Sequence, residues 1–318
     1  MSDPIGSPGW PVKPNAGGLR AKLVAARLGG CYRIRVMWRS NVLNEIERLD
    51  PVRDHQRIVF LSCRVDFPFD TTRALEFALF RTFCVPSISA LLQRTGEFEA
   101  RPQKRYDDTD IIVSELMEHG YDSERGRTAL RRLNQIHSRF AIANEDYLYV
   151  LSTFVFEPIR WNERFGWRRL VPQERLGLFY FWREVGRRMN IKDIPIESNE
   201  FEAFNRRYER QHYQYTEANH RVGLATRNLF LSWFPRWTHP LVRPAIHAMM
   251  DEPILAAFGF TRPAAPTRWS VEAALRARAV ILRFLPRRTQ PSLRTRMKHP
   301  SYPGGYRIED VGPNSSPV

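Results

Sequence analysis

The chain has 318 residues, of which 43% are hydrophobic and 12% aromatic, and such a composition excludes a disordered protein. The formal net charge of +15 favours anionic partners, and three cysteines (Cys31, Cys63 and Cys84) argue against a secreted disulfide framework, so reduced thiols are expected. Residues 1–18 are rich in proline and glycine and are expected to be irregular. Apolar residues then recur at helical spacing along most of the chain. This spacing predicts helices over residues 19–28, 34–48, 71–84, 86–92, 105–119, 126–142, 146–157, 172–189, 199–215, 217–233, 242–258 and 270–285.

Strict two-residue alternation is scarce, and residues 50–260 contain neither an internal repeat nor a low-complexity linker. The predicted fold class is therefore all-α, with a single large helical domain over residues 50–260. A basic N-terminal segment (1–49) precedes this domain. A basic helix and a turn-rich tail follow it in residues 261–318, and the tail is expected to run extended over the surface from Pro300.

The positive charge lies at the two ends of the chain. Residues 4–44 carry seven Lys/Arg and no acid, and residues 262–299 carry ten Lys/Arg and one acid. Such ends fit nucleic acid, an anionic membrane surface, or a solvated surface without a partner. Residues 270–285 have the pattern of a basic amphipathic helix with Ser270 as its N-cap and Pro286 after its end. We therefore expect peripheral membrane contact and no nucleic-acid partner.

No apolar stretch approaches the ~20 residues that a membrane-spanning helix needs. Tyr147–Phe156 is among the longest. The N-terminus lacks the hydrophobic core of a signal peptide. The expectation is a cytoplasmic protein, peripheral to a membrane, and the oligomeric state is left open.

Several well-known motifs are absent from the sequence. It contains no Cys-x-x-Cys-His, so a haem would not be attached covalently. It also lacks His-Glu-x-x-His, a Walker A motif and Gly-x-Gly-x-x-Gly, which removes the simplest metalloprotease, nucleotide and dinucleotide interpretations.

Arg105 and Thr109 form an Arg-x-x-x-Thr pair in the helix predicted over 105–119. They extend an apolar face, while the acids of this helix, such as Asp107 and Glu118, lie mostly on other faces. A buried arginine must find an anion because an unpaired buried charge is very costly. A haem propionate would serve, and so would an Asp or Glu from a neighbouring helix.

His137 lies on the apolar face of the next predicted helix, with Leu130, Leu133 and Phe140 at helical spacing. A histidine in such a place is more often a hydrogen-bonded core residue than a ligand. Its neutral imidazole nevertheless offers a lone pair to iron, and the apolar face offers a dry wall to a porphyrin. If Arg105, Thr109 and His137 meet in one pocket, the chain is a haem protein.

The other histidines form weaker candidates. His212 and His220 are eight residues apart, as are His239 and His247, and neither pair has the spacing with which one helix chelates a metal. The segment after His137 predicts a central helix, apolar nearly all round, that Asn144 or Asp146 caps. Its aromatic residues fit core packing or the wall of a hydrophobic cavity.

Taken in order, these elements resemble the haem-dependent oxygenase family of latex-clearing protein (rubber oxygenase), and most of all the branch of the mycophenolic-acid pathway oxygenase. The stretch that resembles the family runs from about Asp54 to Phe234. The resemblance is carried by Arg105-x-x-x-Thr109, by His137 28 positions later, by Asn144–Tyr147, and by the segments Glu157–Trp161, Phe181–Gly186 and Tyr302–Tyr306.

The resemblance implies a globin-like helical core that binds one non-covalent haem b, with His137 as proximal iron ligand and metal site. Arg105 and Thr109 would be the family's polar pair beside the haem, as cofactor-binding and catalytic residues. It implies dioxygen as co-substrate and oxidative cleavage of C=C bonds in an unsaturated, hydrophobic substrate of isoprenoid or lipid-like kind. Asp108 stands where the latex-clearing enzymes carry a lysine, so a lysine-capped closed state is not expected. The membrane-bound branch also differs, since no spanning helix is evident here.

The sequence does not identify a distal acid or base, for which Asp107, Asp108 and Glu97 are candidates. Two other classes of protein remain open. One is a haem-binding sensor or carrier without turnover. The other is a haem-free helical adaptor that docks on a membrane surface. The prediction is a haem-dependent oxygenase.

Overall fold

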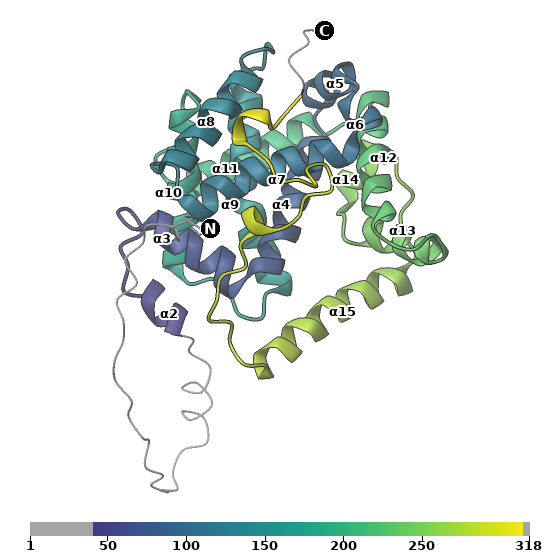
Figure 1. The fold of residues 1–318 in the computed structure, drawn as a ribbon. Helices are drawn as coiled ribbons and strands as arrows, with labels where there is room; N and C mark the ends of the chain where they lie inside the picture. The colour runs from purple at the N-terminus through teal and green to yellow at the C-terminus, as the bar shows by residue number, and fades with distance from the viewer. Residues whose placement is uncertain (1–40, 314–318) are drawn as a thin grey trace, which may run out of the picture.

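The computed structural model describes residues 41–313, and within this range the fold is all-helical, with no β-strand (Figure 1). Residues 1–40 and 314–318 lie outside the described part, and with them the helix expected over 19–28 and the start of the one expected over 34–48. The α-helices are α2 (Asn41–Ile46), α3 (His55–Phe60), α4 (Pro68–Thr82), α5 (Pro86–Thr95), α6 (Glu97–Ala100), α7 (Pro102–His119), α8 (Glu124–His137), α9 (Asn144–Phe165), α10 (Pro172–Arg188), α11 (Ser198–His212), α12 (Glu217–Ser232), α13 (His239–Ala248), α14 (Glu252–Phe258) and α15 (Ala265–Phe284). A π-helical turn, η1 (Leu61–Asp66), and three 3₁₀ turns, η2 (Arg236–Thr238), η3 (Arg294–Arg296) and η4 (Ile308–Asp310), complete the set.

The helix α9 forms the centre of the body, as its apolar composition predicts. It packs against α4, α10, α11 and α15, and most of its side chains are buried. It begins at Asn144 without a side-chain cap, with Glu145 and Asp146 in its first turn near the positive end of the helix. It also continues through Pro158, past the predicted end, because the buried Trp161 and Phe165 pack against α4.

Further predicted helix boundaries are also wrong. The helix expected over 242–258 is two helices, because Asp251 caps α14 by accepting a hydrogen bond from the Ile254 backbone N–H at 3.1 Å. The helix expected over 126–142 ends at His137. Ser270 is not an N-cap, since α15 begins five residues earlier, at Ala265. Local patterns give the existence of these helices but not their ends.

The C-terminal tail lies over α7, in agreement with the expectation of a tail extended on the surface (Figure 1). Acidic side chains of α7 hold it there, and these acids are buried rather than solvated. Asp107 accepts a hydrogen bond from the Ser301 backbone N–H at 2.8 Å, and Glu118 accepts one from the Arg294 backbone N–H at 2.7 Å. The face of α7 opposite Arg105 therefore binds the tail.

Helix length and apolarity over residues 41–313 indicate whether the chain could cross a membrane there. No single helix in this range is long and apolar enough to cross a bilayer. The pair α4 and α5 meets the length and composition required only when taken together, and the two helices are bent by 97° where they join.

Gly177 permits the close approach of α10 to α3. A Cβ atom at this position would lie 2.7 Å from Cγ2 of Ile58, a buried and β-branched side chain that cannot rotate away easily. Gly177→Ala is expected to lower the free energy of unfolding by about 1–3 kcal/mol, measured by chemical denaturation. Gly304→Ala is the matched control, because no atom lies within 4 Å of its added Cβ. Equal losses in the two variants would contradict this account.

Candidate functional site

The site predicted from sequence is built on α7 and α8, which pack against each other. Pro102 begins α7, where its missing N–H is not needed, and the positive φ of Gly120 (77°) ends it. Ser123 caps α8 by accepting a hydrogen bond from the Gly126 backbone N–H at 2.9 Å. These local signals fix the two helices that carry Arg105 and His137.

His137 is the last residue of α8 and is half-buried. Its Nδ1 atom is buried and has no hydrogen-bond partner in residues 41–313. Desolvation by burial, and after it the charge of Arg105, lower the pKa of His137 to about 4. The ring is therefore neutral at pH 7 and packs beside Tyr147, with ring centroids 5.4 Å apart. Neutral imidazole is the form that can donate a lone pair to a metal.

Arg105 lies near enough to His137 for its charge to act on the histidine. It is half-buried, desolvation lowers its pKa, and its guanidinium lies 5.4 Å from the ring centroid of Phe98. The acids that act on it are Asp108 and Glu97. Each of these already forms an ion pair with another cation, Asp108 with Lys104 at 2.9 Å and Glu97 with Arg101. Within the described part of the chain, Arg105 thus has no carboxylate at ion-pair distance, and the predicted Asp or Glu partner is not found there.

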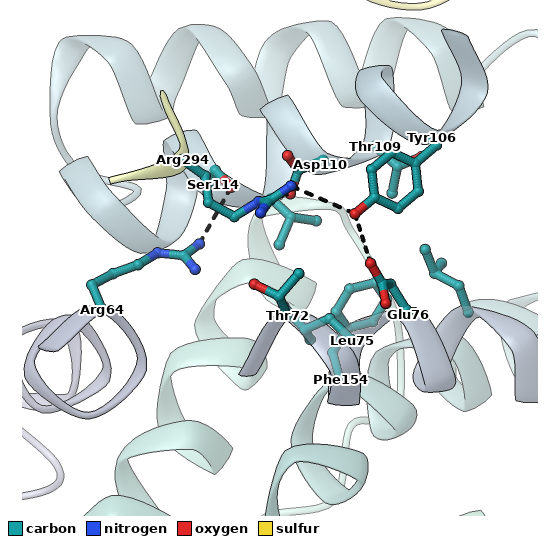
Figure 2. Close-up of a pocket in the computed structure, with 12 residues that line it drawn as sticks. Arg64, Thr72, Leu75, Glu76, Tyr106, Thr109, Asp110, Ser114, Phe154 and Arg294 are labelled. Carbon is teal, nitrogen blue, oxygen red and sulfur yellow. Dashed lines mark hydrogen bonds and ion pairs between the residues drawn. The ribbon is translucent and has the colours of Figure 1, made fainter. Parts of the chain in front are cut away.

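Thr109 lies one turn after Arg105, and its hydroxyl donates a hydrogen bond to the Arg105 carbonyl oxygen at 3.0 Å. Thr109 also lines a cavity of about 30 Å³ between α4, α7 and α9, whereas Arg105 and His137 do not (Figure 2). Leu75, Leu79 and Val113 supply much of its apolar wall. A volume of about 30 Å³ is that of one water molecule. The structure therefore places Arg105 within electrostatic reach of His137, and it places Thr109 on a cavity that neither of them lines.

A polar cluster that the sequence analysis missed borders the same cavity (Figure 2). Glu76 accepts hydrogen bonds from Tyr106 Oη and from Arg73, both at 2.7 Å, and Arg294 from the tail forms an ion pair with Asp110 at 2.6 Å. Desolvation by burial raises the pKa of Glu76 to about 7. A signal was available, because Glu76 is an acid on the apolar helix predicted over 71–84.

The raised pKa of Glu76 predicts a dependence of stability on pH. The ordinary pKa is 4.5 and the folded value is about 7, so the native state binds more protons than the unfolded state between these pH values. Stability from this group is fully present below pH 4.5 and is lost as the pH rises through about 7. The variant Glu76→Gln does not lose this stability. Its free energy of unfolding, relative to that of wild type, should therefore rise by up to roughly 3 kcal/mol between pH 4.5 and about 7. Denaturation curves at a series of pH values measure this, and a constant difference between the two proteins would contradict it.

The candidates for a distal acid are all engaged elsewhere. Asp108 also accepts a hydrogen bond from Tyr302 Oη at 2.5 Å, and Asp107 accepts one from Gln103 at 2.9 Å in addition to its bond with the tail. Glu97 is held by Arg101 on the surface. None of the three is aimed at His137, so the structure assigns them to helix and tail contacts.

The remaining candidate histidines contact the protein itself. His212 stacks on Tyr208, and His247 stacks on Phe260. His220 and His239 each lie at hydrogen-bond distance from a backbone carbonyl oxygen, those of Phe258 and Phe234. Over residues 41–313 no group of three or more His, Cys, Asp or Glu side chains could hold a metal ion by itself. Cys63 and Cys84 are buried free thiols, as expected.

Curated relatives of this chain are oxygenases from Penicillium. "ER-bound oxygenase mpaB'" of Penicillium brevicompactum is 28% identical over 241 residues, which are 70% of this chain and 57% of the relative. "ER-bound oxygenase mpaB" of Penicillium roqueforti (strain FM164) is 29% identical over 211 residues, or 60% of this chain and 70% of the relative. "ER-bound oxygenase mpaB" of Penicillium brevicompactum is 36% identical over 142 residues, 42% of this chain and 36% of that protein. The chain thus spans little more than half the length of the first of these relatives.

The family described as "ER-bound oxygenase mpaB/B'/Rubber oxygenase, catalytic domain" matches residues 76–284. This range begins at Glu76 and contains Arg105, Thr109 and His137, the residues on which the resemblance in the sequence rests. It also covers more than half of the chain. The chain therefore belongs to the MpaB and rubber oxygenase catalytic-domain family.

Proposed function

We propose that this oxygenase depends on haem b and acts with dioxygen on an unsaturated, hydrophobic substrate of isoprenoid or lipid-like kind, cleaving a C=C bond. The observation that carries the proposal is the pair formed by His137 and Arg105. A neutral imidazole with an unpartnered buried nitrogen lies within electrostatic reach of a desolvated guanidinium, which has no carboxylate at ion-pair distance within residues 41–313. A haem would bind both groups, since its iron accepts the lone pair of the His137 imidazole and its propionates pair with the Arg105 guanidinium.

The residues fit a haem on chemical grounds. One histidine is enough to anchor a haem, because the porphyrin supplies the other four equatorial nitrogen ligands. The low pKa of His137 means that no proton has to be displaced at neutral pH before the ring binds a metal. Arg105 stays charged, since an arginine cannot be deprotonated under such conditions, and its planar fork suits a bidentate bond to a carboxylate.

Each residue of the site has a proposed role in the reaction. A bound haem supplies the redox chemistry that dioxygen needs in order to react with an alkene. His137 would hold the cofactor by ligating its iron and would tune its electronics. Arg105 fixes its orientation by binding a propionate, and Thr109 steadies the turn of α7 that carries Arg105 by bonding to its carbonyl oxygen. The apolar side chains around the cavity, such as Leu79 and Val113, exclude water.

The proposed substrate class is supported by the apolar part of the cavity wall and by the family's printed description, which names a rubber oxygenase. A cavity of about 30 Å³ does not hold an isoprenoid chain, so the substrate requires side chains of α4, α7 and α9 to move apart. The proposal therefore includes an opening of these helices, which a bound haem and substrate would both favour by mass action.

Oxygen consumption tests this function. The purified chain is loaded with haemin and mixed with emulsified squalene or cis-1,4-polyisoprene in an oxygen-electrode cell, and carbonyl products are trapped and identified by mass spectrometry. The proposal predicts continuous oxygen uptake with one aldehyde or ketone pair for each cleaved bond. Haem binding without substrate-dependent uptake would instead make the protein a haem carrier or sensor. His137→Ala, loaded in the same way, should give no uptake above free haemin.

A further inference from the structure

The helix α15 exposes an unusually large part of its surface. It lies along one edge of the body and contacts mainly α13 and α9 (Figure 1). Only Ala279 among its twenty residues is buried. Its inner side is fixed by Arg278, whose guanidinium forms an ion pair with the buried Asp70 of α4 at 3.0 Å. The opposite side of α15 therefore faces away from the body.

That outward side carries apolar residues where a soluble helix carries polar ones. At 3.6 residues per turn, five of them fall within about a third of the helix circumference. They form the α15 apolar stripe, which consists of Trp269, Ala273, Ala277, Val280 and Ile281.

The stripe exposes large side chains. Trp269 is 74% exposed and Ile281 is 58% exposed. The neighbouring helix α13 and the turn η2 before it add two more exposed apolar side chains, Trp237 at 80% and Leu241 at 75%. Single exposed apolar residues are ordinary, but contiguous ones on one helix face mark an interaction surface. Tryptophan in particular is favoured where an apolar phase meets water.

The charge around the stripe is strongly positive. Residues 233–288 contain nine arginines and three acids. Arg276 lies along one flank of the stripe and Arg288 follows its C-terminal end, both exposed, whereas Arg283 donates a hydrogen bond to the Trp167 carbonyl oxygen at 2.7 Å. An arginine beside an apolar stripe can place its aliphatic stem along the apolar phase and its guanidinium among anionic groups. This arrangement complements the headgroup layer of an anionic bilayer.

The positive charge around the stripe argues against two other partners that could cover it. A second copy of the chain would place arginines of this face against an equally basic surface. The N-terminal residues 4–44, with seven Lys/Arg and no acid, would also bring like charge to it. Like charges in contact repel one another, whereas anionic lipid attracts basic residues. The charge thus favours lipid.

We propose that the α15 apolar stripe lies in the headgroup region of an anionic membrane, with Arg276 and Arg288 contacting lipid phosphate or carboxylate groups. The helix lies parallel to the membrane plane and does not cross it. The proposal is independent of the haem, because none of its residues touches His137 or Arg105. It gives the chain a means of reaching substrates that are dissolved in lipid.

Vesicle flotation with the full chain tests the proposal. The protein should float with vesicles of phosphatidylcholine containing about 30% phosphatidylserine and should bind at least about tenfold more weakly to pure phosphatidylcholine. Binding should also weaken at about 1 M salt, where the Debye length falls to about 3 Å. Equal binding to both lipids at both salt concentrations would overturn the anionic-headgroup part of the proposal.

Two pairs of variants locate the surface. Trp269→Gln with Ile281→Gln, and separately Arg276→Gln with Arg288→Gln, should each reduce binding by about tenfold or more. Val52→Gln with Ile196→Gln controls for exposed apolar residues elsewhere, and Arg131→Gln with Arg210→Gln controls for charge. Unchanged binding in the α15 variants would move the docking surface to another part of the chain and refute the proposal.

The solution mass of the protein decides between lipid and a second copy. If the stripe does not bind a second copy of the chain, light scattering should give the stripe variants the same solution mass as wild type. A wild-type dimer that Trp269→Gln with Ile281→Gln dissociates would show that the stripe is a protein interface and would overturn the proposal. All variants should retain the haem spectrum of wild type, which separates a failure of this inference from a failure of the proposed function.

Discussion

His137→Ala should lose haem binding, with an affinity for haemin at least about 100-fold below that of wild type. The loss of a residue that only supports a metal ligand already costs about 10–100-fold, and the loss of the ligand itself should cost more. A haem without a covalent attachment depends on this one coordinate bond and on contacts with its ring and propionates. Titration with haemin, followed by the Soret band, measures the effect.

His119→Ala is a matched control for this variant. His119 is the last residue of α7, as His137 is of α8, and it is also half-buried with one buried ring nitrogen that lacks a hydrogen-bond partner in the described residues. Burial lowers its pKa as well. His119→Ala should therefore bind haemin as wild type does. If both variants bind equally well, His137 is not the ligand, and if both fail, the loss is structural.

Glu118→Ala should be strongly destabilising, lowering the free energy of unfolding by about 3–5 kcal/mol. Glu118 forms an ion pair with Arg64 at 3.0 Å, and both side chains are buried. It also accepts hydrogen bonds from the backbone N–H groups of Arg294 and Thr295 in the tail, at 2.7 and 3.1 Å. Its removal leaves the charge of Arg64 buried and unpaired and releases the tail from α7. Urea denaturation measures the loss.

The double variant Arg64→Met with Glu118→Leu separates these causes. Replacing a buried ion pair by apolar residues of similar size is often neutral, because it also removes the desolvation cost of both charges. The double variant should therefore be more stable than Glu118→Ala by about 2 kcal/mol or more. A double variant as unstable as Glu118→Ala would show that the tail contacts, and not the buried charge, account for the loss.

Much of the fold could be predicted from the sequence because its helices are long and strongly periodic. The apolar composition of Asn144–Phe165 indicated a central helix, and α9 is central. The spacing around Arg105 and His137 indicated that each lies on the apolar, core-facing side of its helix, and α7 and α8 do pack together. Both predictions depend only on the local period of a helix, which is fixed by backbone geometry.

Other features could not be predicted because they depend on contacts between distant parts of the chain. The acids of α7 look like a solvated face in the sequence, and only the tail from Arg294 onwards explains why Glu118 is buried. Glu76 appears as one acid on an apolar helix, and its raised pKa requires the burial that α4 and α7 provide together. Periodicity within one element carries no information on such pairings.

The visible spectrum of the purified chain, with a pyridine haemochrome assay after loading with haemin, tests the central claim most directly. The account predicts a Soret band and one haem b per chain, with an axial imidazole that disappears in His137→Ala. A chain that binds no haem under these conditions, with its helical structure intact by circular dichroism, would contradict the claim that His137 and Arg105 form a haem site.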